Sequence, residues 1–213
     1  MPRIEQWREM WKGLGATSAD AGLFSQLIER YSERHRHYHT VQHLDECFAW
    51  LPKTRLLAQH PHEIELALWF HDAIYDVKRQ DNEQQSADWA KAAALRSGLS
   101  APTAERVYDL VMVTRHRAQP EGTDAKILVD IDLSILGAPS ERFDEYERQV
   151  RAEYAWVPGL RFRRKRRQIL EEFIARPQIF NTDSFVESHE AQARSNLQRS
   201  FEIGDAAAFV TFW

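Results

Sequence analysis

The chain of 213 residues carries 28 Lys and Arg against 32 Asp and Glu, for a formal net charge of −4, and 43% of its residues are hydrophobic. This balance is typical of a globular protein and argues against disorder and against a protein that coats nucleic acid. Because Cys47 is the only cysteine and no stretch reaches the roughly 18 apolar residues of a membrane span, we expect a cytoplasmic protein with no internal disulfide and no membrane partner.

Apolar residues recur at helical spacing along most of the chain, and the alternation typical of strands is nearly absent. Gly and Pro turn signals separate the helical segments. In chain order, helices are expected over 23–31, 62–70, from 81 or 82 onward, over 107–113, 127–136 and 162–174, and from 182 or 183 to a stop at Gly204. The pattern predicts an all-α fold of roughly eight or nine helices. We expect one domain over 1–213, in which the helices of 140–213 and the apolar tail pack on a core of about 20–140.

The stretch "HRHYHTVQH", residues 35–43, holds four of the nine histidines. His39 and His43 are four residues apart and therefore share one face of a helix, so either or both can point at a common centre. We expect the remaining histidines outside the motifs to lie on the surface: His35, His37, His60, His62 and His189.

In "WFHDAIYD", His71 and Asp72 follow the apolar run 66–70, so their helix is expected to be buried nearly all round. A charged Asp72 without a partner would be costly there, because desolvation disfavours the ionised carboxylate. An ion pair or hydrogen bonds at the helix end would compensate it. A divalent metal would also do so, because it accepts both a neutral imidazole and a carboxylate.

A third apolar segment, "LVDIDLSILG", contains Asp130 and Asp132. Three separate segments therefore each offer a His or Asp that needs a partner. In a helical bundle, ligands from different helices that meet at one ion would satisfy all of them together.

The ordered set of a His, a His-Asp doublet and a distant Asp resembles the HD-domain superfamily of metal-dependent phosphohydrolases. Within it, "RHYHT", "WFHDAIYD", "DNEQQSA" and "DIDLSILG" are similar to motifs of small bacterial proteins described as predicted HD phosphohydrolases, over about residues 20–200. The resemblance implies a single HD-type helical domain whose metal ligands are His43, His71, Asp72 and Asp132.

The same resemblance implies that His39 protonates the leaving group, as the matching histidine does in the helical cyclic-nucleotide phosphodiesterases. Asp130 is the rival of Asp132 for the last ligand. The resemblance of "DLS" to the related HD motif favours Asp132 and leaves Asp130 as a helix cap or salt-bridge partner.

Glu83 and His116 lie between the doublet and the last Asp, where related HD enzymes use a Glu and a His to touch the water network, the substrate or a second metal. Glu83 fits equally well in the first turn of a helix, and His116 also fits as a cation near a helix end. A substrate phosphate would need cations, and Arg36 and Arg115 are the first candidates because guanidinium groups suit phosphate oxygens.

The run "RFRRKRR", residues 161–167, lies on a helix whose apolar stripe includes Phe162, Leu170 and Phe173. The stripe indicates that the basic residues form the solvated side of this helix. A nucleic-acid partner is therefore not expected.

These features predict a metal-dependent enzyme that hydrolyses a phosphate ester or anhydride of a small phosphorylated substrate such as a nucleotide, with catalytic roles for His39, Asp72, Glu83 and His116. Nitrogen and oxygen ligands suit Mn, Fe, Ni, Co, Zn or Mg. One alternative is a non-catalytic HD module that binds metal or a nucleotide. Another is a di-iron HD oxygenase, which calls for further histidines beside His116. The sequence leaves the substrate, the number of ions and the oligomeric state open.

Overall fold

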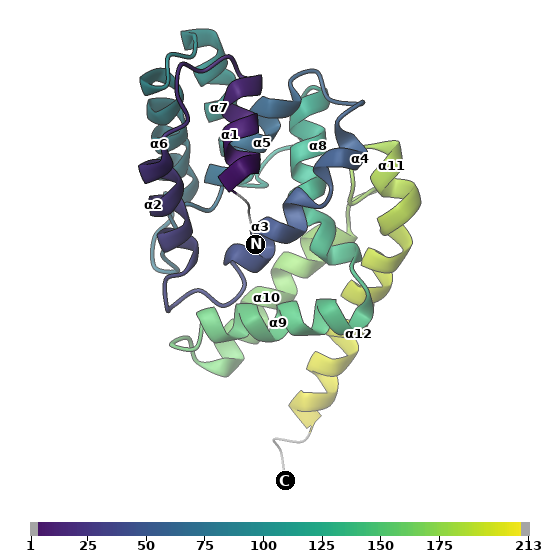
Figure 1. Cartoon of the computed structure of the whole chain (residues 1–213). Coiled ribbons are helices and arrows are strands. Elements are labelled where there is room, and N and C mark those ends of the chain that lie inside the picture. Colours follow the sequence, from purple (N-terminus) through teal and green to yellow (C-terminus); the bar gives the residue numbers. More distant parts are fainter. Residues whose placement is uncertain (1–3, 210–213) are drawn as a thin grey trace. The chain divides into compact units, whose positions relative to one another are not determined.

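The computed structural model describes the backbone of residues 4–209 and the side chains of residues 4–201. Every regular element in that part of the chain is helical, which confirms the predicted all-α class (Figure 1). Ten of these helices have eight or more residues, close to the predicted number. None of the described helices is long and apolar enough to cross a membrane. The chain divides into two compact units, 1–132 and 133–213, and the expectation of one domain stays a prediction.

The first unit is built around α5, which contacts five other helices of the unit, namely α1, α3, α6, α7 and α8. All of its residues from Glu63 to Phe70 are buried, as the apolar run predicts. The elements of this unit are α1 (Ile4–Gly13), α2 (Ala21–Tyr31), α3 (Val41–Phe48), α4 (Leu51–Thr54), α5 (Pro61–Phe70), α6 (Asn82–Arg96), α7 (Ala101–Val113) and α8 (Thr123–Asp132).

Side-chain caps fix where the helices next to the site begin. Asp20 accepts the backbone N–H groups of Gly22 and Leu23 at 2.8 and 3.1 Å and starts α2. Thr40 accepts the N–H of Gln42 at 3.2 Å and starts α3. Because α3 begins at this cap, His43 lies in its first turn and His39 precedes the helix, so the expectation that the two histidines share one helix face is wrong.

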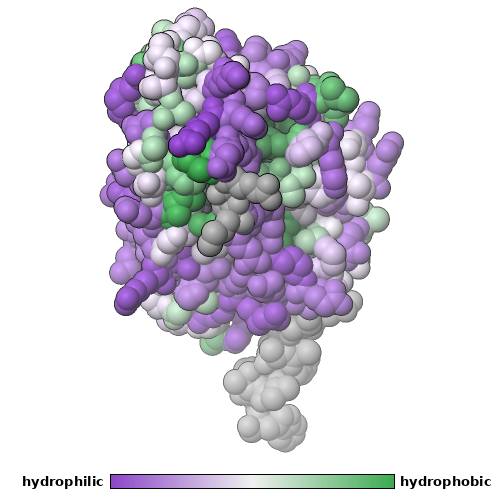
Figure 2. All heavy atoms as spheres, viewed as in Figure 1, coloured by the Kyte–Doolittle hydropathy of each residue, from purple (hydrophilic) through white to green (hydrophobic). Residues whose placement is uncertain are grey.

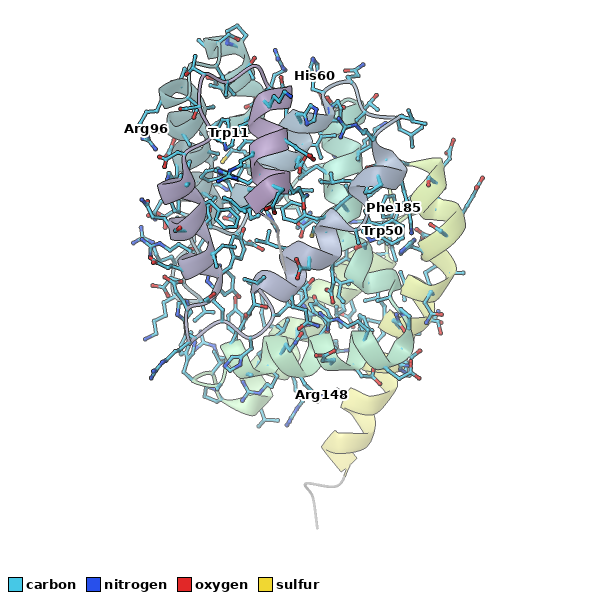
Figure 3. The ribbon with its side chains drawn as sticks, in the orientation of Figure 1. Trp11, Trp50, His60, Arg96, Arg148 and Phe185 are labelled. Carbon is cyan, nitrogen blue, oxygen red and sulfur yellow. The ribbon has the colours of Figure 1, made fainter. Side chains whose placement is uncertain are left out.

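An aromatic cluster holds the second half of α5 in place. The ring of Trp69 lies 4.6 Å from Phe48, 5.3 Å from Trp7 and 5.7 Å from Phe24, measured between centroids. Trp11, labelled in Figure 3, meets Trp7 edge-on at 5.4 Å. Large buried rings in such edge-to-face contacts are a strong source of packing energy. They anchor the helix that leads directly to His71.

The second unit begins with a 3-10 turn and closes with the long α12, which contacts η1, η2 and α10. Buried Asn196 on α12 donates to the carbonyls of Leu136 and Ala138 at 2.9 and 2.8 Å. A Cβ at Gly137 would lie 2.6 Å from the Cβ of His189, so only glycine fits there. The elements are η1 (Leu133–Gly137), α9 (Ser140–Glu153), α10 (Gly159–Ile174), α11 (Asp183–Phe185), the π-helical turn η2 (Val186–Glu190) and α12 (Ala191–Phe209).

Two expectations for this unit are wrong. Gly204 does not end the last helix, because α12 continues to Phe209. His189 is buried instead of lying on the surface, because its ring packs against the rings of Phe180 and Phe185. The expected docking of the apolar tail concerns residues 210–213 and the side chains from 202 onward, which lie outside the described part of the chain.

Candidate metal centre

His71 and Asp72 stand where the buried helix α5 gives way to a turn. The helix ends at Phe70, and His71 is its C-cap residue. The hydroxyl of Tyr31, on α2, donates to the carbonyl of Trp69 at 3.3 Å and accepts the N–H of Asp72 at 3.2 Å. These two bonds fix the backbone on both sides of the doublet.

Four side chains from three parts of the first unit converge beside this turn. His43 Nε2 lies 3.0 Å from His71 Nε2 and 3.2 Å from Asp132 Oδ1. His71 Nε2 lies 3.0 Å from Asp72 Oδ2 and 3.6 Å from Asp132 Oδ1. His43 Nε2 and Asp72 Oδ2 are 3.7 Å apart. The structure thus brings together all four side chains that the sequence nominates as metal ligands.

The donor set fits a divalent ion. Donors that lie about 2.0–2.2 Å from one ion at tetrahedral or octahedral angles are roughly 3.0–3.6 Å from each other. Most of the separations around His43 and His71 fall in this range. Imidazole nitrogen and carboxylate oxygen are also ligands that Mn, Fe, Co, Ni and Zn accept together.

The ring of His71 is oriented for coordination by its second nitrogen. Nδ1 lies 2.8 Å from the carbonyl of Leu68. Because a carbonyl can only accept, Nδ1 carries the proton of the neutral ring, and Nε2 turns a lone pair toward His43 and the two carboxylates. Such a bond from the far nitrogen is the usual way in which a protein fixes the tautomer of a metal-binding histidine.

The two carboxylates are ionised although they are deeply placed. Burial would raise the pKa of Asp72, but the positive charges of His71 and His39 hold it well below its usual value. Burial would likewise raise the pKa of Asp132, but hydrogen bonds from His116, His43 and His71 lower it strongly. The centre therefore attracts positive charge.

The pKa of His71 is shifted in the opposite direction from those of the two carboxylates. Burial would lower the pKa of its ring, but the charge of Asp72 and hydrogen bonds with Asp132 and Asp72 raise it well above its usual value. Without an ion, a proton on His71 is the charge that balances these carboxylates. A bound metal would take over this role.

His116 holds the outer oxygen of Asp132. Its Nε2 lies 3.0 Å from Asp132 Oδ2, which leaves Oδ1 to face His43 and His71. The backbone of His116 has φ +52°, and it is the only residue besides glycine with positive φ among those described. This left-handed conformation is costly for a side chain with a Cβ, and such strain is typical of functional sites. His116 therefore belongs to the site.

Asp130 and Asp132 have different surroundings in the structure. Asp132 Oδ1 lies 3.2 Å from His43 Nε2, whereas Asp130 is fully buried within the helix packing. Two residues apart on one helix, the two side chains point in different directions. The arrangement agrees with the choice of Asp132 as ligand.

Cys47 is a neighbour of the cluster that the sequence analysis missed. The ligand atoms of His43, Cys47, His71 and Asp132 all lie within 4.8 Å of one another, so this buried group could hold a metal ion. The sulfur of Cys47 is 3.8 Å from both ring nitrogens of His43, however, which places it beside the ring and off the lone-pair axis of Nε2. Its position four residues after His43 was the signal that could have found it.

His39 lies at the edge of the centre. Its ring stacks on Tyr75 with 4.1 Å between centroids and is 6.1 Å from the ring of His43. It is close enough to Asp72 for its charge to lower the pKa of that carboxyl. The predicted proton donor is thus beside the metal ligands and is held by an aromatic face.

Arg36 has a different surrounding from the one expected of a substrate ligand. Its side chain has no exposed surface, and Nη1 donates to the carbonyls of His39 and Asp72 at 3.2 and 2.6 Å. Nη2 donates to the carbonyl of Ala73 at 3.0 Å, and Nε donates to Glu33 at 3.1 Å. This set of bonds, here called the Arg36 clamp, ties the turn before α3 to the turn after α5. It supports a positioning role and not a contact with phosphate.

Glu83 and Arg115 form a pair near the end of α7. Glu83 lies in the first turn of α6, and its Oε2 is 3.7 Å from Arg115 Nε. This distance is too long for a hydrogen bond, and the buried Nε of Arg115 has no acceptor. Arg115 directly precedes His116, so an unsatisfied guanidinium donor lies one residue from a side chain that contacts Asp132.

No protein-family model matches the chain, and no curated protein or solved structure shows significant similarity to it. The relation to HD phosphohydrolases therefore stays a prediction from the motifs.

Proposed function

We propose that this chain is a divalent-metal-dependent phosphohydrolase that cleaves a phosphate ester or anhydride of a small metabolite, with a nucleotide as the first candidate. The observation that carries the proposal is the convergence of two imidazole nitrogens, which lie 3.0 Å from each other and 3.0–3.7 Å from oxygens of two ionised carboxylates. An ion at His43, His71, Asp72 and Asp132 would polarise a phosphoryl oxygen and lower the pKa of a water molecule.

The residues around the ligands have separate tasks in this proposal. His116 holds Asp132 through Oδ2, so that Oδ1 keeps its direction toward His43 and His71. His39, stacked on Tyr75 beside Asp72, donates a proton to the departing oxygen.

Arg115 is the group best suited to bind the substrate phosphate. Its buried Nε lacks an acceptor, and Glu83 is close enough to orient the guanidinium without saturating it. A phosphate oxygen would supply the missing acceptor in a charge-assisted hydrogen bond. Arg36, whose donors are already engaged with backbone carbonyls, is left to position the ligand-bearing turns.

The test is release of inorganic phosphate from a panel of nucleotides, cyclic nucleotides and simple phosphoesters with added Mn²⁺, for the wild type beside Asp72→Ala. We expect turnover of at least one class of substrate that disappears in Asp72→Ala. Metal content and circular dichroism of both proteins show whether each is folded and loaded.

Two outcomes would contradict the proposal. Turnover that survives in Asp72→Ala would place the chemistry elsewhere. Absence of turnover across the panel from folded, metal-loaded protein would favour a non-catalytic module or a di-iron oxygenase, which ligand-binding and oxygen-uptake measurements then distinguish.

A further inference from the structure

The unit 133–213 carries a concentration of positive charge that the proposed hydrolysis does not use. Between residues 148 and 167 the chain carries eight Arg or Lys and one Glu, although its net charge is −4. Five of these cations are exposed on α10, and we call them the α10 basic surface: Arg161, Arg163, Arg164, Lys165 and Arg167. The remaining exposed cation of this stretch is Arg148 on α9, labelled in Figure 3.

Most of this charge is not neutralised within the unit. Arg166 is bound to Glu147 and Tyr146, and Arg167 pairs with Glu171 at 2.9 Å. Among the described side chains, Arg161, Arg163 and Arg164 have no carboxylate within 4 Å. Three neighbouring guanidinium groups are therefore exposed and have no counter-charge among the described side chains.

The placement of these cations opposes the stability of their own helix. The first turn of α10 contains no acidic residue, and Pro158 at its start makes no side-chain cap. The N-terminal end of a helix carries partial positive charge, so cations there repel the dipole and anions would be favoured. An anion from outside the chain would remove this conflict.

Two large apolar side chains stand at the same end of α10. Trp156 is 57% exposed and Leu160 is 76% exposed. Leu160 is four and seven residues before Arg164 and Arg167, so these three side chains share the outer face of the helix. Leu170, the buried residue of α10, lies ten residues after Leu160 and about 80° away from it around the helix axis. The outer face thus combines an apolar tip with a basic flank.

We propose that the α10 basic surface, together with Trp156 and Leu160, binds the surface of a bilayer that contains anionic phospholipid. Trp at the level of the headgroups, an apolar side chain inserted beside it and Arg or Lys on lipid phosphates form the usual composition of an interfacial helix. Absence of a crossing helix does not bear on this contact, because the helix lies on the bilayer and does not enter its core.

Other occupants fit the surface less well. A single-stranded nucleic acid would use the guanidinium groups and stack on Trp156, but it gives no role to Leu160, the more exposed of the two apolar residues. A second copy of the chain would bring the same unpaired cations together, and their repulsion opposes association. A bilayer uses both the charge and the apolar tip.

The experiment is co-sedimentation of the full chain with vesicles, at about 0.1 M NaCl where surface charges still act. We expect binding to phosphatidylcholine vesicles that contain about 30 mol% phosphatidylglycerol and none to phosphatidylcholine alone. Arg163→Glu combined with Arg164→Glu should weaken binding at least about tenfold. Leu160→Ser should also weaken it, and its loss should persist when salt is raised.

A matched control and a local probe make the result specific. Arg8→Glu combined with Arg96→Glu changes the net charge by the same amount at exposed positions of the other unit, and this variant should bind like the wild type (Figure 3 labels Arg96). Brominated lipid should quench part of the tryptophan fluorescence of the wild type. Trp156→Phe should remove that quenching while circular dichroism stays unchanged.

Three results would overturn the proposal. The first is failure of the folded wild type to bind anionic vesicles. The second is equal binding by the wild type and the Arg163→Glu, Arg164→Glu variant. The third is binding of a single-stranded oligonucleotide without binding of vesicles, which would show that the surface recognises nucleic acid.

Discussion

At the scale of single residues, the site depends on side chains that divide their atoms between two tasks. Asp132 uses Oδ1 toward His43 and His71 and Oδ2 toward His116. His71 uses Nδ1 toward a carbonyl and Nε2 toward the centre. Each outer bond fixes the direction of an inner donor, so loss of the outer partner should be felt by the metal.

The two aspartates of α8 should respond differently to substitution. Asp132→Ala removes a ligand and should lower the affinity for Mn²⁺ or Zn²⁺ at least about 100-fold while most helix content remains. Asp130→Ala removes a fully buried carboxylate from the helix interior and should lower the melting temperature with little change in metal affinity. Isothermal titration and thermal unfolding measure the two effects. The reverse order would make Asp130 the ligand.

The strained backbone at His116 allows its side chain and its conformation to be tested separately. His116→Gly removes the donor to Asp132 but suits φ +52°, whereas His116→Ala removes the donor and keeps the strain. We expect equal losses of metal affinity in both variants. In urea unfolding, the Ala variant should be less stable than the Gly variant by about 1 kcal/mol. Equal stabilities would show that the left-handed conformation is not retained in solution.

At the scale of elements, the Arg36 clamp joins the turn that leads into α3 to the turn that follows α5. It binds three backbone carbonyls, those of His39, Asp72 and Ala73. Its guanidinium also lies over the rings of Tyr31 and Tyr75, at 5.2 and 5.5 Å from their centroids. The relative positions of the turns that carry His43 and Asp72 therefore depend on one buried side chain.

Removal of this clamp should affect both stability and metal binding. Arg36→Met leaves buried carbonyls without a donor and should cost about 2–4 kcal/mol of unfolding free energy. Arg36→Lys keeps the charge but cannot donate in a planar fork, so it should restore stability only in part. We expect metal affinity to fall in both variants, more in Met than in Lys. Unchanged affinity in a folded Arg36→Met protein would show that the turns hold their positions without the clamp.

The elements and the ligand types could be predicted because their signals are local. Helical spacing marks α5, and a His-Asp doublet after an apolar run demands a partner wherever the chain folds. The role of Arg36 could not be predicted, because two of its acceptors are backbone carbonyls 36 and 37 residues away. Every residue has a backbone carbonyl, so the residue types at those positions do not indicate the contact. Similarly, the burial of His189 depends on the close approach of Gly137, which is 52 positions distant in the chain.

At the scale of the whole molecule, stability should be coupled to protons and metal through the first unit. The lowered pKa values of Asp72 and Asp132 stabilise the fold above the carboxyl values of the unfolded chain, and this contribution is lost as pH falls. The raised pKa of His71 stabilises the fold below about 6.5, the value in the unfolded chain, and this contribution is lost as pH rises through the folded value.

Thermal unfolding in chelator should therefore show a maximum between these limits, with the melting temperature falling as pH rises above about 6.5. With Mn²⁺ or Zn²⁺ present, ligation replaces the proton on His71, and the fall on the alkaline side should disappear. Asp72→Asn should flatten the alkaline limb in chelator, because the partner that raises the pKa of His71 is gone. A melting temperature in chelator that stays constant from pH 6 to 9 would contradict this coupling.

The uneven distribution of charge has a practical consequence for purification. With an isoelectric point near 6.1, the protein should be retained by an anion exchanger at neutral pH. The unpaired guanidinium groups on α10 should nevertheless also hold it on a sulfonate or heparin column at low salt, because a resin responds to the local potential of a face and not to the sum over the molecule. The variant with Arg163→Glu and Arg164→Glu should elute from the sulfonate or heparin column at markedly lower salt than the wild type. This difference would identify α10 as the face that binds the resin.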